Sequence, residues 1–418
     1  MLTARRRTFV VAAAIGAAVA LQSPAVAQGG SLDPAFGSGG TVVTNVGAGD
    51  AAVEGIALQP DGRIVVAGYA WNGTDQDIAV ARYTASGVLD PTFGSGGITL
   101  TDVNGDQNGA EAVALQPDGR IVVVGFSGGD FVAVRYTADG VLDPTFGHDG
   151  IVVSNVGGDA EADAVAIQPN GDVLAAGWSE TSGQWNMVVT RYSSDGSLDK
   201  TFHKTGRVSI DFKSNDYATS ILVQPDGKIL VAGGSGDAGT QIAMARLRTT
   251  GGVDKTFGTN GKTTTSFPGT LASWADGAAL QSDGKIVLSG FVYDGSHYRI
   301  ALCRYTAAGA LDGSFAGNGR VITNLGPGED AAHAVTIQPD GDIVVAGGAG
   351  DDFGVARYTA SGTLDPAFGG GAGYVTTDLG ATDEAEAALL QPDGKIVAAG
   401  FSGDSSRLSF ALARYAGT

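Results

Sequence analysis

The feature that most constrains this chain is an internal repeat of three short elements, each present seven times in the same order. A Gln-Pro-Asp-Gly-like turn recurs every 52 to 57 residues. It is followed by an Arg-Tyr-like element and then by a Leu-Asp-x-x-Phe-like element. Such a period indicates one supersecondary unit that buries its apolar surface against the next unit. The turns begin at Gln59, Gln116, Gln168, Gln224, Gln281, Gln338 and Gln391, and the Leu-Asp elements at Leu32, Leu89, Leu142, Leu198, Val253, Leu311 and Leu364.

One unit shows the expected local structure. Residues 111–116 alternate like a strand, residues 117–119 form a Pro-Asp-Gly turn, and two further apolar strands span 120–125 and 131–137. Pro presets the φ of a turn and Gly accepts the positive φ that follows, which is typical of a hairpin. A short, irregular fourth strand lies within 142–153. The sequence therefore predicts an all-β fold, a seven-bladed β-propeller of four-stranded antiparallel blades, formed by residues 28–418 as one domain.

The two ends of the chain predict how the ring closes. A lone fourth strand, from Leu32 to Val42, precedes the first complete unit, and the last unit ends after three strands at Tyr415. We expect the N-terminal strand to complete the C-terminal blade, because this pairing leaves no open sheet edge at the joint.

The arginine of each Arg-Tyr element lies eight residues before the aspartate of the next Leu-Asp element. Arg414 has no such aspartate after it and Asp33 has no such arginine before it, so we predict that they pair across the closure. So regular an array could bind a ligand, but we favour buried ion pairs that fix turns. The expected pairs are Arg82–Asp90, Arg135–Asp143, Arg191–Asp199, Arg246–Asp254, Arg304–Asp312, Arg357–Asp365 and Arg414–Asp33.

The N-terminal residues are typical of an export signal. Arg5 to Arg7 precede an apolar run from Phe9 to Leu21 and a small-residue cleavage site at Ala25 to Ala27, so residues 1–27 are predicted to be a cleaved signal peptide. The arginines fit either a Sec or a twin-arginine signal. No later apolar run is long enough to span a bilayer. We therefore expect a secreted, extracellular protein.

Composition narrows the partners. The chain has 44 acidic and 25 basic residues and a net charge of −19, so nucleic acid is not an expected partner. The single cysteine, Cys303, excludes an intramolecular disulfide and replaces an alanine of other units, as a small core residue would. We expect a monomer that binds a protein or carbohydrate ligand.

The units resemble the delta-60 repeats of bacterial secreted and surface proteins. The resemblance is carried by Leu89-Asp-Pro-Thr-Phe-Gly94, Gln116-Pro-Asp-Gly119 and Val134-Arg-Tyr136, and it covers essentially the whole chain after residue 27. It implies a repeat architecture and brings no established catalytic residues, so the function remains open.

One set of positions could carry chemistry. Five residues before each Gln-Pro-Asp-Gly-like turn, where the first strand of each unit enters, stand Glu54, Glu111, Asp163, Thr219, Asp276, His333 and Glu386. We call these the channel-mouth positions, because an innermost first strand would place them around the central channel. Five carboxylates and an imidazole could bind a hard cation such as Ca²⁺. We favour a structural interpretation, in which they hydrogen-bond adjacent blades because side chains of a radial blade point at its neighbours.

Aromatic residues gather in the variable loops between second and third strands, which we expect on the same face as the channel mouth. Exposed aromatic side chains on loops can stack on sugars or contact a protein partner, although they could equally pack locally. These candidate ligand-face residues are Trp71, Trp178, Trp185, Tyr293, His297, Tyr298 and Phe401.

Two functions are consistent with these patterns. The first is a secreted, non-enzymatic binding or scaffold module for a cell-surface, polysaccharide or protein ligand, with no required cofactor. It rests on the regular repeat and on the lack of a His-Glu-x-x-His or paired-cysteine motif. The alternative is a metal-assisted hydrolase, lactonase or lyase, with Ca²⁺ at the channel mouth and His333 as a base.

Overall fold

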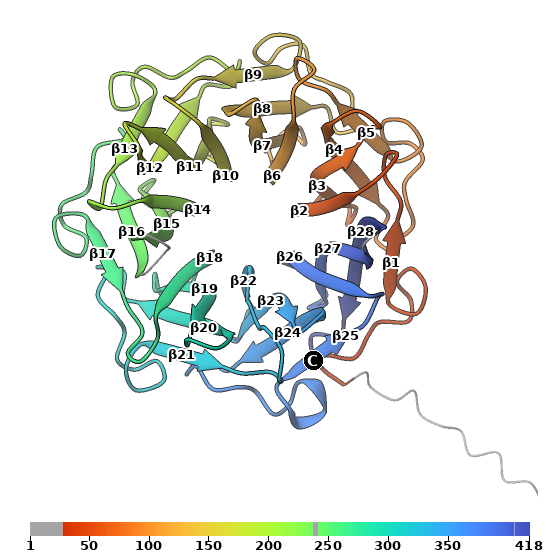
Figure 1. Ribbon diagram of the computed structural model, residues 1–418, viewed down its shortest axis with the longest axis vertical. Helices are drawn as coiled ribbons and strands as arrows, with labels where there is room; N and C mark the ends of the chain where they lie inside the picture. The colour runs from red at the N-terminus through yellow and green to blue at the C-terminus, as the bar shows by residue number, and fades with distance from the viewer. Residues whose placement is uncertain (1–27, 237–240, 405) are drawn as a thin grey trace, which may run out of the picture.

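The computed structural model describes residues 28–236, 241–404 and 406–418. The signal peptide predicted at residues 1–27 lies outside the described residues. Seven four-stranded antiparallel sheets surround a central axis (Figure 1). In six of them the strands follow chain order from the inside outward, and in the seventh the outermost strand comes from the start of the chain. The predicted seven-bladed propeller is confirmed. The part of the chain that the structure describes contains no helix long and apolar enough to cross a membrane.

The strands occupy equivalent places in every blade, and blades 1 to 7 are numbered from β2 onward. The innermost strands are β2 (Ala51–Leu58), β6 (Asn108–Leu115), β10 (Ala160–Ile167), β14 (Asp216–Val223), β18 (Ala272–Leu280), β22 (Ala334–Ile337) and β26 (Thr382–Leu390). The second strands are β3 (Ile64–Trp71), β7 (Ile121–Ser127), β11 (Val173–Thr181), β15 (Ile229–Ser235), β19 (Ile286–Tyr293), β23 (Ile343–Ala349) and β27 (Ile396–Asp404).

The outer half of each blade is a third strand and a short fourth strand. The third strands are β4 (Gln76–Tyr83), β8 (Asp130–Tyr136), β12 (Gln184–Tyr192), β16 (Gln241–Leu247), β20 (Tyr298–Tyr305), β24 (Asp352–Tyr358) and β28 (Arg407–Tyr415). The outermost strands are β5 (Ile98–Thr101), β9 (Ile151–Ser154), β13 (Arg207–Ile210), β17 (Lys262–Thr265), β21 (Arg320–Thr323), β25 (Tyr374–Thr377) and β1 (Thr41–Thr44). A short 3-10 turn, η1 (Gly369–Gly371), precedes β25.

Strand β1 closes the ring, as predicted. It pairs antiparallel with β28, from Thr41 opposite Ala413 to Thr44 opposite Phe410, and so becomes the outer strand of blade 7. Upstream of β1, Leu32 bridges Tyr415, and the Asp33 amide donates to the Arg414 carbonyl at 2.8 Å. The first and last segments of the described chain are therefore joined in one sheet.

Apolar side chains fill the spaces between blades. Between blades 1 and 2, Val65 and Val80 share a buried cluster with Val123 and Val134, and Phe93 closes its outer end. Second and third strands are apolar on both faces because a blade in a ring has a neighbour on each side. The core is thus seven similar inter-blade clusters.

All seven expected Arg–Asp pairs are present, with N···O distances of 2.6 to 2.9 Å. In blade 4, Arg246 Nε lies 2.9 Å from Asp254 Oδ2, and its guanidinium carbon lies 4.6 Å from the centre of the Phe257 ring. Arg246 also donates to the Ala307 carbonyl in the next blade at 2.8 Å. The pair therefore links neighbouring blades as well as fixing its own turn.

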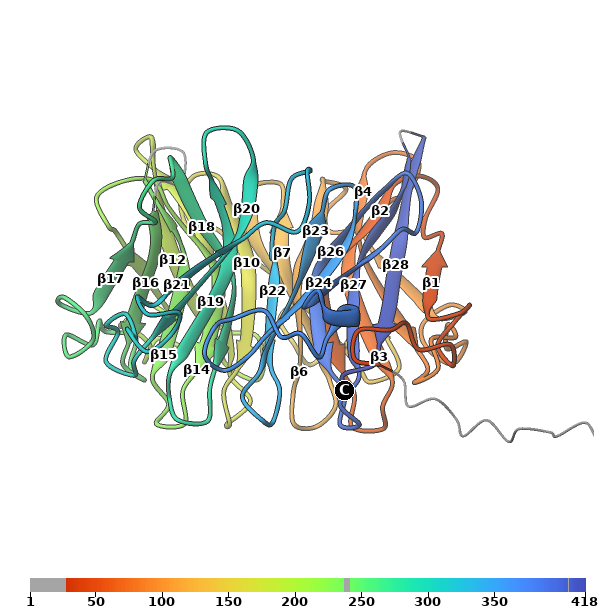
Figure 2. The same ribbon diagram turned by 90° about the horizontal axis from the view of Figure 1, so that it is seen from below.

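The ring has two different faces. Each innermost strand begins on the face where each second strand ends, as shown by Ala51 opposite Ala70 at the ends of β2 and β3. We call this the loop face, because it carries the variable connections between second and third strands (the upper side in Figure 2). The Gln-Pro-Asp-Gly-like turns lie on the opposite face.

Candidate functional site

A β-bulge positions the channel-mouth side chains. In six blades the pairing between the innermost and second strands skips one residue, and that residue is a channel-mouth position in every case. A bulge leaves one residue outside the ladder and redirects its side chain. His333 stands at the equivalent place, directly before β22.

The seven positions converge on one cavity of about 270 Å³ on the loop side of the channel. The bulge places these residues on the channel, yet Asp276, His333 and Glu111 also hydrogen-bond side chains of an adjacent blade, as the structural interpretation expects. Thr219 follows the structural interpretation, since its hydroxyl donates to the Ala275 carbonyl of the next blade at 2.6 Å. Among the described residues that line the cavity there is no lysine or arginine.

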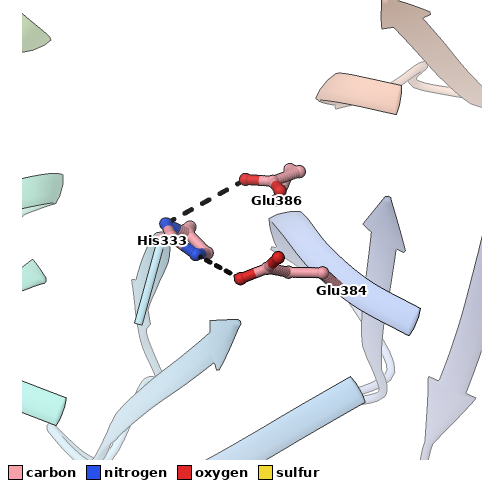
Figure 3. Close-up of side chains that lie close together, drawn as sticks. All are labelled: His333, Glu384 and Glu386. Carbon is pink, nitrogen blue, oxygen red and sulfur yellow. Dashed lines mark hydrogen bonds and ion pairs between the residues drawn. The ribbon is translucent and has the colours of Figure 1, made fainter. Parts of the chain in front are cut away.

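His333 bridges carboxylates from two other blades. Figure 3 shows its contacts with Glu384 and Glu386 of blade 7. Its Nδ1 lies 2.9 Å from Asp276 Oδ2 and 4.0 Å from Glu386 Oε2, and its Nε2 lies 2.9 Å from Glu384 Oε1. Burial alone would lower the pKa of His333, but the hydrogen bonds to Asp276 and Glu384 and the charge of Glu386 raise it well above 6.5. The imidazole is therefore protonated, and both ring nitrogens donate.

Two glutamates that the sequence analysis missed extend the site. Glu384 and Glu161 stand two residues before a channel-mouth position, and each reaches back to the preceding blade. Glu384 bonds His333, and Glu161 shares a hydrogen bond with Glu111. A Cβ on Gly348 would lie 3.0 Å from Glu384 Oε1, so this glycine leaves room for the contact. We call Glu54, Glu111, Glu161, Asp163, Asp276, His333, Glu384 and Glu386 the neck.

The carboxyl groups of the neck hold their protons unusually tightly. Burial, reinforced by neighbouring carboxylates, raises the pKa of Glu54 to about 9 and that of Glu111 to about 8. Burial also raises the pKa of Glu386, to about 7, although the nearby His333 opposes the shift. The pKa values of Asp163 and Glu161 are raised as well, mainly by burial. The neck therefore carries protons near neutral pH that separate, solvated carboxyl groups would have lost.

Aromatic side chains form two clusters on the loop face beside the neck. In the first, the ring centres of Trp178 and Tyr217 lie 5.2 and 5.1 Å from that of Trp185. The second runs in the order Trp274, Phe291, Tyr298 and Tyr293, and successive ring centres lie 5.0 to 5.2 Å apart. The Phe291 ring centre also lies 6.3 Å from that of His333, so the second cluster reaches the neck.

The other candidate ligand-face residues stand outside these clusters. Trp71 packs against the loop around Gly49, and His297 closes a turn through a 2.9 Å hydrogen bond from its amide to Asp294. Phe401 lies opposite Glu384 in blade 7. Three members of the two clusters were not predicted. Tyr217 and Trp274 lie on innermost strands, and Phe291 was missed although it occupies the same place on its second strand as Trp178 and Phe401.

The sequence profile of the family described as "Domain of unknown function (DUF5122) beta-propeller" matches residues 59–93, 116–146, 168–202, 224–257, 281–315, 338–368 and 391–416. These segments make up more than half of the chain. The chain belongs to this family. Each of the first six matches runs from the glutamine of a turn to the phenylalanine of the following Leu-Asp element.

Solved structures similar to this DUF5122 propeller share its fold. Selenomethionine-substituted virginiamycin B lyase from Staphylococcus aureus is 13% identical, with a TM-score of 0.54 over 89% of this chain and 98% of that chain. A catalytically inactive histidine-to-alanine variant of that lyase with quinupristin is 14% identical, with a TM-score of 0.51 and the same coverage. A Lactobacillus plantarum protein is 17% identical, with a TM-score of 0.51 over 85% of this chain and 96% of that chain. No curated protein matches the sequence.

Proposed function

We propose that this DUF5122 propeller is a secreted, non-enzymatic binding module, built from delta-60 repeats, that receives a cell-surface, polysaccharide or protein ligand at its channel mouth. The observation that carries the proposal is the repeated bulge, which turns side chains from all around the ring toward one cavity. Aromatic clusters beside that cavity supply the stacking surfaces that ligand sites commonly use. The export signal predicted at residues 1–27 supports a site of action outside the cell.

The state of His333 favours binding over acid–base catalysis. A general base needs a free lone pair near the proton that it removes. Both ring nitrogens of His333 lie 2.9 Å from carboxylate oxygens, and the raised pKa keeps the ring protonated. The residue therefore serves better as a fixed positive charge that orients Asp276 and Glu384.

One observation supports metal-assisted catalysis as a second candidate. His333, Glu384 and Glu386 can each offer a ligand atom, and these atoms lie within 4.8 Å of one another. Ca²⁺ prefers oxygen ligands, which the carboxylates of the neck would supply, and a bound cation would polarise a carbonyl of a hydrolase or lyase substrate. Virginiamycin B lyase has a similar fold, which at 13% identity says nothing of the chemistry here.

The four tryptophans give a direct test, because Trp71, Trp178, Trp185 and Trp274 all lie on the loop face. A panel of polysaccharides and envelope proteins is titrated while tryptophan fluorescence is followed. We expect at least one saturable response that is lost in the Glu111→Gln/Glu386→Gln variant and retained in the exposed control Asp149→Asn. A ligand that binds the wild type and both variants with equal affinity would show that its binding site lies outside the neck. If Ca²⁺ raises the Tm of the wild type but not that of the Glu111→Gln/Glu386→Gln variant, the metal-assisted candidate is favoured.

A further inference from the structure

The neck is strongly asymmetric in charge. Asp276 and Glu384 are already paired with the His333 imidazolium on one side of the channel. The remaining acidic positions, Glu386, Glu54, Glu111 and Asp163, come from four consecutive blades, and of these Glu386 lies 4.0 Å from His333. No lysine or arginine lies among the described residues of the cavity. Because they are buried and close together, these four groups hold protons near neutral pH, and a cation bound among them would displace those protons and pair with the carboxylates.

The side chains of these four residues act on one another directly. The carboxylates of Glu111 and Glu386 both contribute to the raised pKa of Glu54, and those of Glu161 and Glu111 contribute to that of Asp163. Asp163 Oδ2 has almost no exposed surface and no hydrogen-bond partner among the described residues. A buried, unpartnered oxygen in a ligand cavity indicates a site that a hydrogen-bond donor can satisfy.

Tyr69 stands in blade 1 where Phe291 stands in blade 5, and the Phe291 ring centre lies 6.3 Å from that of the channel-mouth residue His333 in the next blade. Tyr69 lies on the second strand of blade 1, and burial, followed by the charges of Glu54 and Glu111, raises its pKa to about 12. The face of an aromatic ring attracts a cation and also packs against the methylene groups that carry it. A bare metal ion would use only the oxygens, whereas an organic cation uses both the oxygens and the ring.

The size of the cavity limits the ligand. A volume of about 270 Å³ equals roughly nine water molecules at about 30 Å³ each, which suits one extended side chain or a small amine. Anionic sugars or carboxylates would find no positively charged partner among the same four residues.

We propose that the neck binds a primary alkylammonium group, an inference that rests on the proposed function. The binding residues are Glu386, Glu54, Glu111, Asp163 and Tyr69. The group is carried either by a free amine or by a lysine side chain of a partner protein. Its three N–H donors bond the carboxylates of adjacent blades, and its methylenes pack against Tyr69.

Three five-carbon probes of different charge test this inference by tryptophan fluorescence: cadaverine, 1,5-pentanediol and glutarate. We expect saturable binding of cadaverine, and no saturable response to the diol or to glutarate. In Glu54→Gln/Glu111→Gln the Kd of cadaverine should rise at least tenfold. Tyr69→Leu should weaken binding several-fold, Tyr69→Phe should retain it, and Asp276→Asn, on the opposite side, should change it least. Lysine capped at both backbone ends is titrated in parallel, and the tighter binder of the two amines identifies the source.

Several results would overturn the inference. One is a response to the diol or glutarate equal to that of cadaverine, and another is Ca²⁺ binding with no response to either amine. A lack of response to every probe also counts against it. None of these results removes the proposed function, which fails only if ligands bind independently of the neck. A melting curve for each variant confirms that it is folded.

Discussion

Deletion of residues 28–46 is expected to lower the Tm of a protein that begins at residue 28 by about 10 °C or more. The deletion removes β1 and the buried Phe36, together with Leu32 and Val42, which pack against buried clusters. Loss of this apolar burial costs roughly 5 to 8 kcal/mol before chain entropy is counted. The deletion also removes Asp33, whose Oδ2 lies 2.8 Å from the Arg414 guanidinium, so that Arg414 loses its ion pair. In addition, β28 becomes an exposed sheet edge.

Differential scanning calorimetry measures this effect, and a rescue experiment shows whether it is specific. A synthetic peptide of residues 28–46, added in trans, should restore most of the lost Tm, whereas a scrambled peptide should not. An unchanged Tm after the deletion would mean that β1 does not hold the ring closed.

The second large effect is an unusual dependence of stability on pH. When folding raises the pKa of a carboxyl group, the folded protein binds more protons than the unfolded protein at pH values above the group's ordinary pKa. The contribution of that group to stability therefore falls as pH rises. Glu54, Glu111 and Glu386 lose this contribution between about pH 5 and pH 9, and His333, whose pKa is also raised, acts in the same direction. Asp254, with a pKa lowered to about 2, acts oppositely but only in stronger acid.

We therefore expect the Tm to fall from pH 5.5 to pH 8.5 in metal-free buffer. The Glu54→Gln variant should show a flatter profile and be more stable than the wild type at pH 8.5 by about 1 kcal/mol or more, since each pKa unit corresponds to about 1.4 kcal/mol. Asp149→Asn should follow the wild-type profile. A wild-type Tm that rises over this range, or a Glu54→Gln variant that is less stable at pH 8.5, would show that the neck carboxyl groups are not desolvated.

Most of the fold could be predicted because the repeat encodes it redundantly. The Gln-Pro-Asp-Gly-like turns defined the hairpins, and the orphan pair Arg414 and Asp33 indicated the closure before any strand pairing was known. The second role of each arginine could not be predicted in the same way. The carbonyl that Arg246 reaches belongs to Ala307, 61 residues away, and no sequence spacing marks a backbone acceptor.

The sequence predicted which residues form the candidate site, but it did not predict the bulges that shape the site. The constant offset from each turn identified the channel-mouth positions, whereas the bulge that redirects them depends on the pairing between two strands. The alternation of residues within one strand does not reveal which residue is left unpaired by the neighbouring strand. The expected contacts with the next blade are present for Thr219, Asp276 and Glu111, and the same positions also line one common cavity.

The missed glutamates had a signal in the composition. The whole chain contains seven glutamates, at positions 54, 111, 161, 180, 329, 384 and 386. Five of them belong to the neck, although aspartate supplies most of the acidic residues elsewhere. A residue type concentrated at one site indicates a role there that the shorter aspartate side chain does not fill. This signal would have added Glu161 and Glu384 to the candidates.

The same scarcity allows a direct test of the central claim, that bulges gather carboxyl groups into one desolvated neck. Labelling the glutamate side-chain carboxyl carbons with ¹³C gives a spectrum of few signals, which single Glu→Gln variants assign. The signals of Glu54, Glu111 and Glu386 should titrate with pKa values of about 9, 8 and 7 in a pH series from 3 to 10. If all three instead titrate below pH 6, these side chains are solvated and separate, and the neck is not the site described.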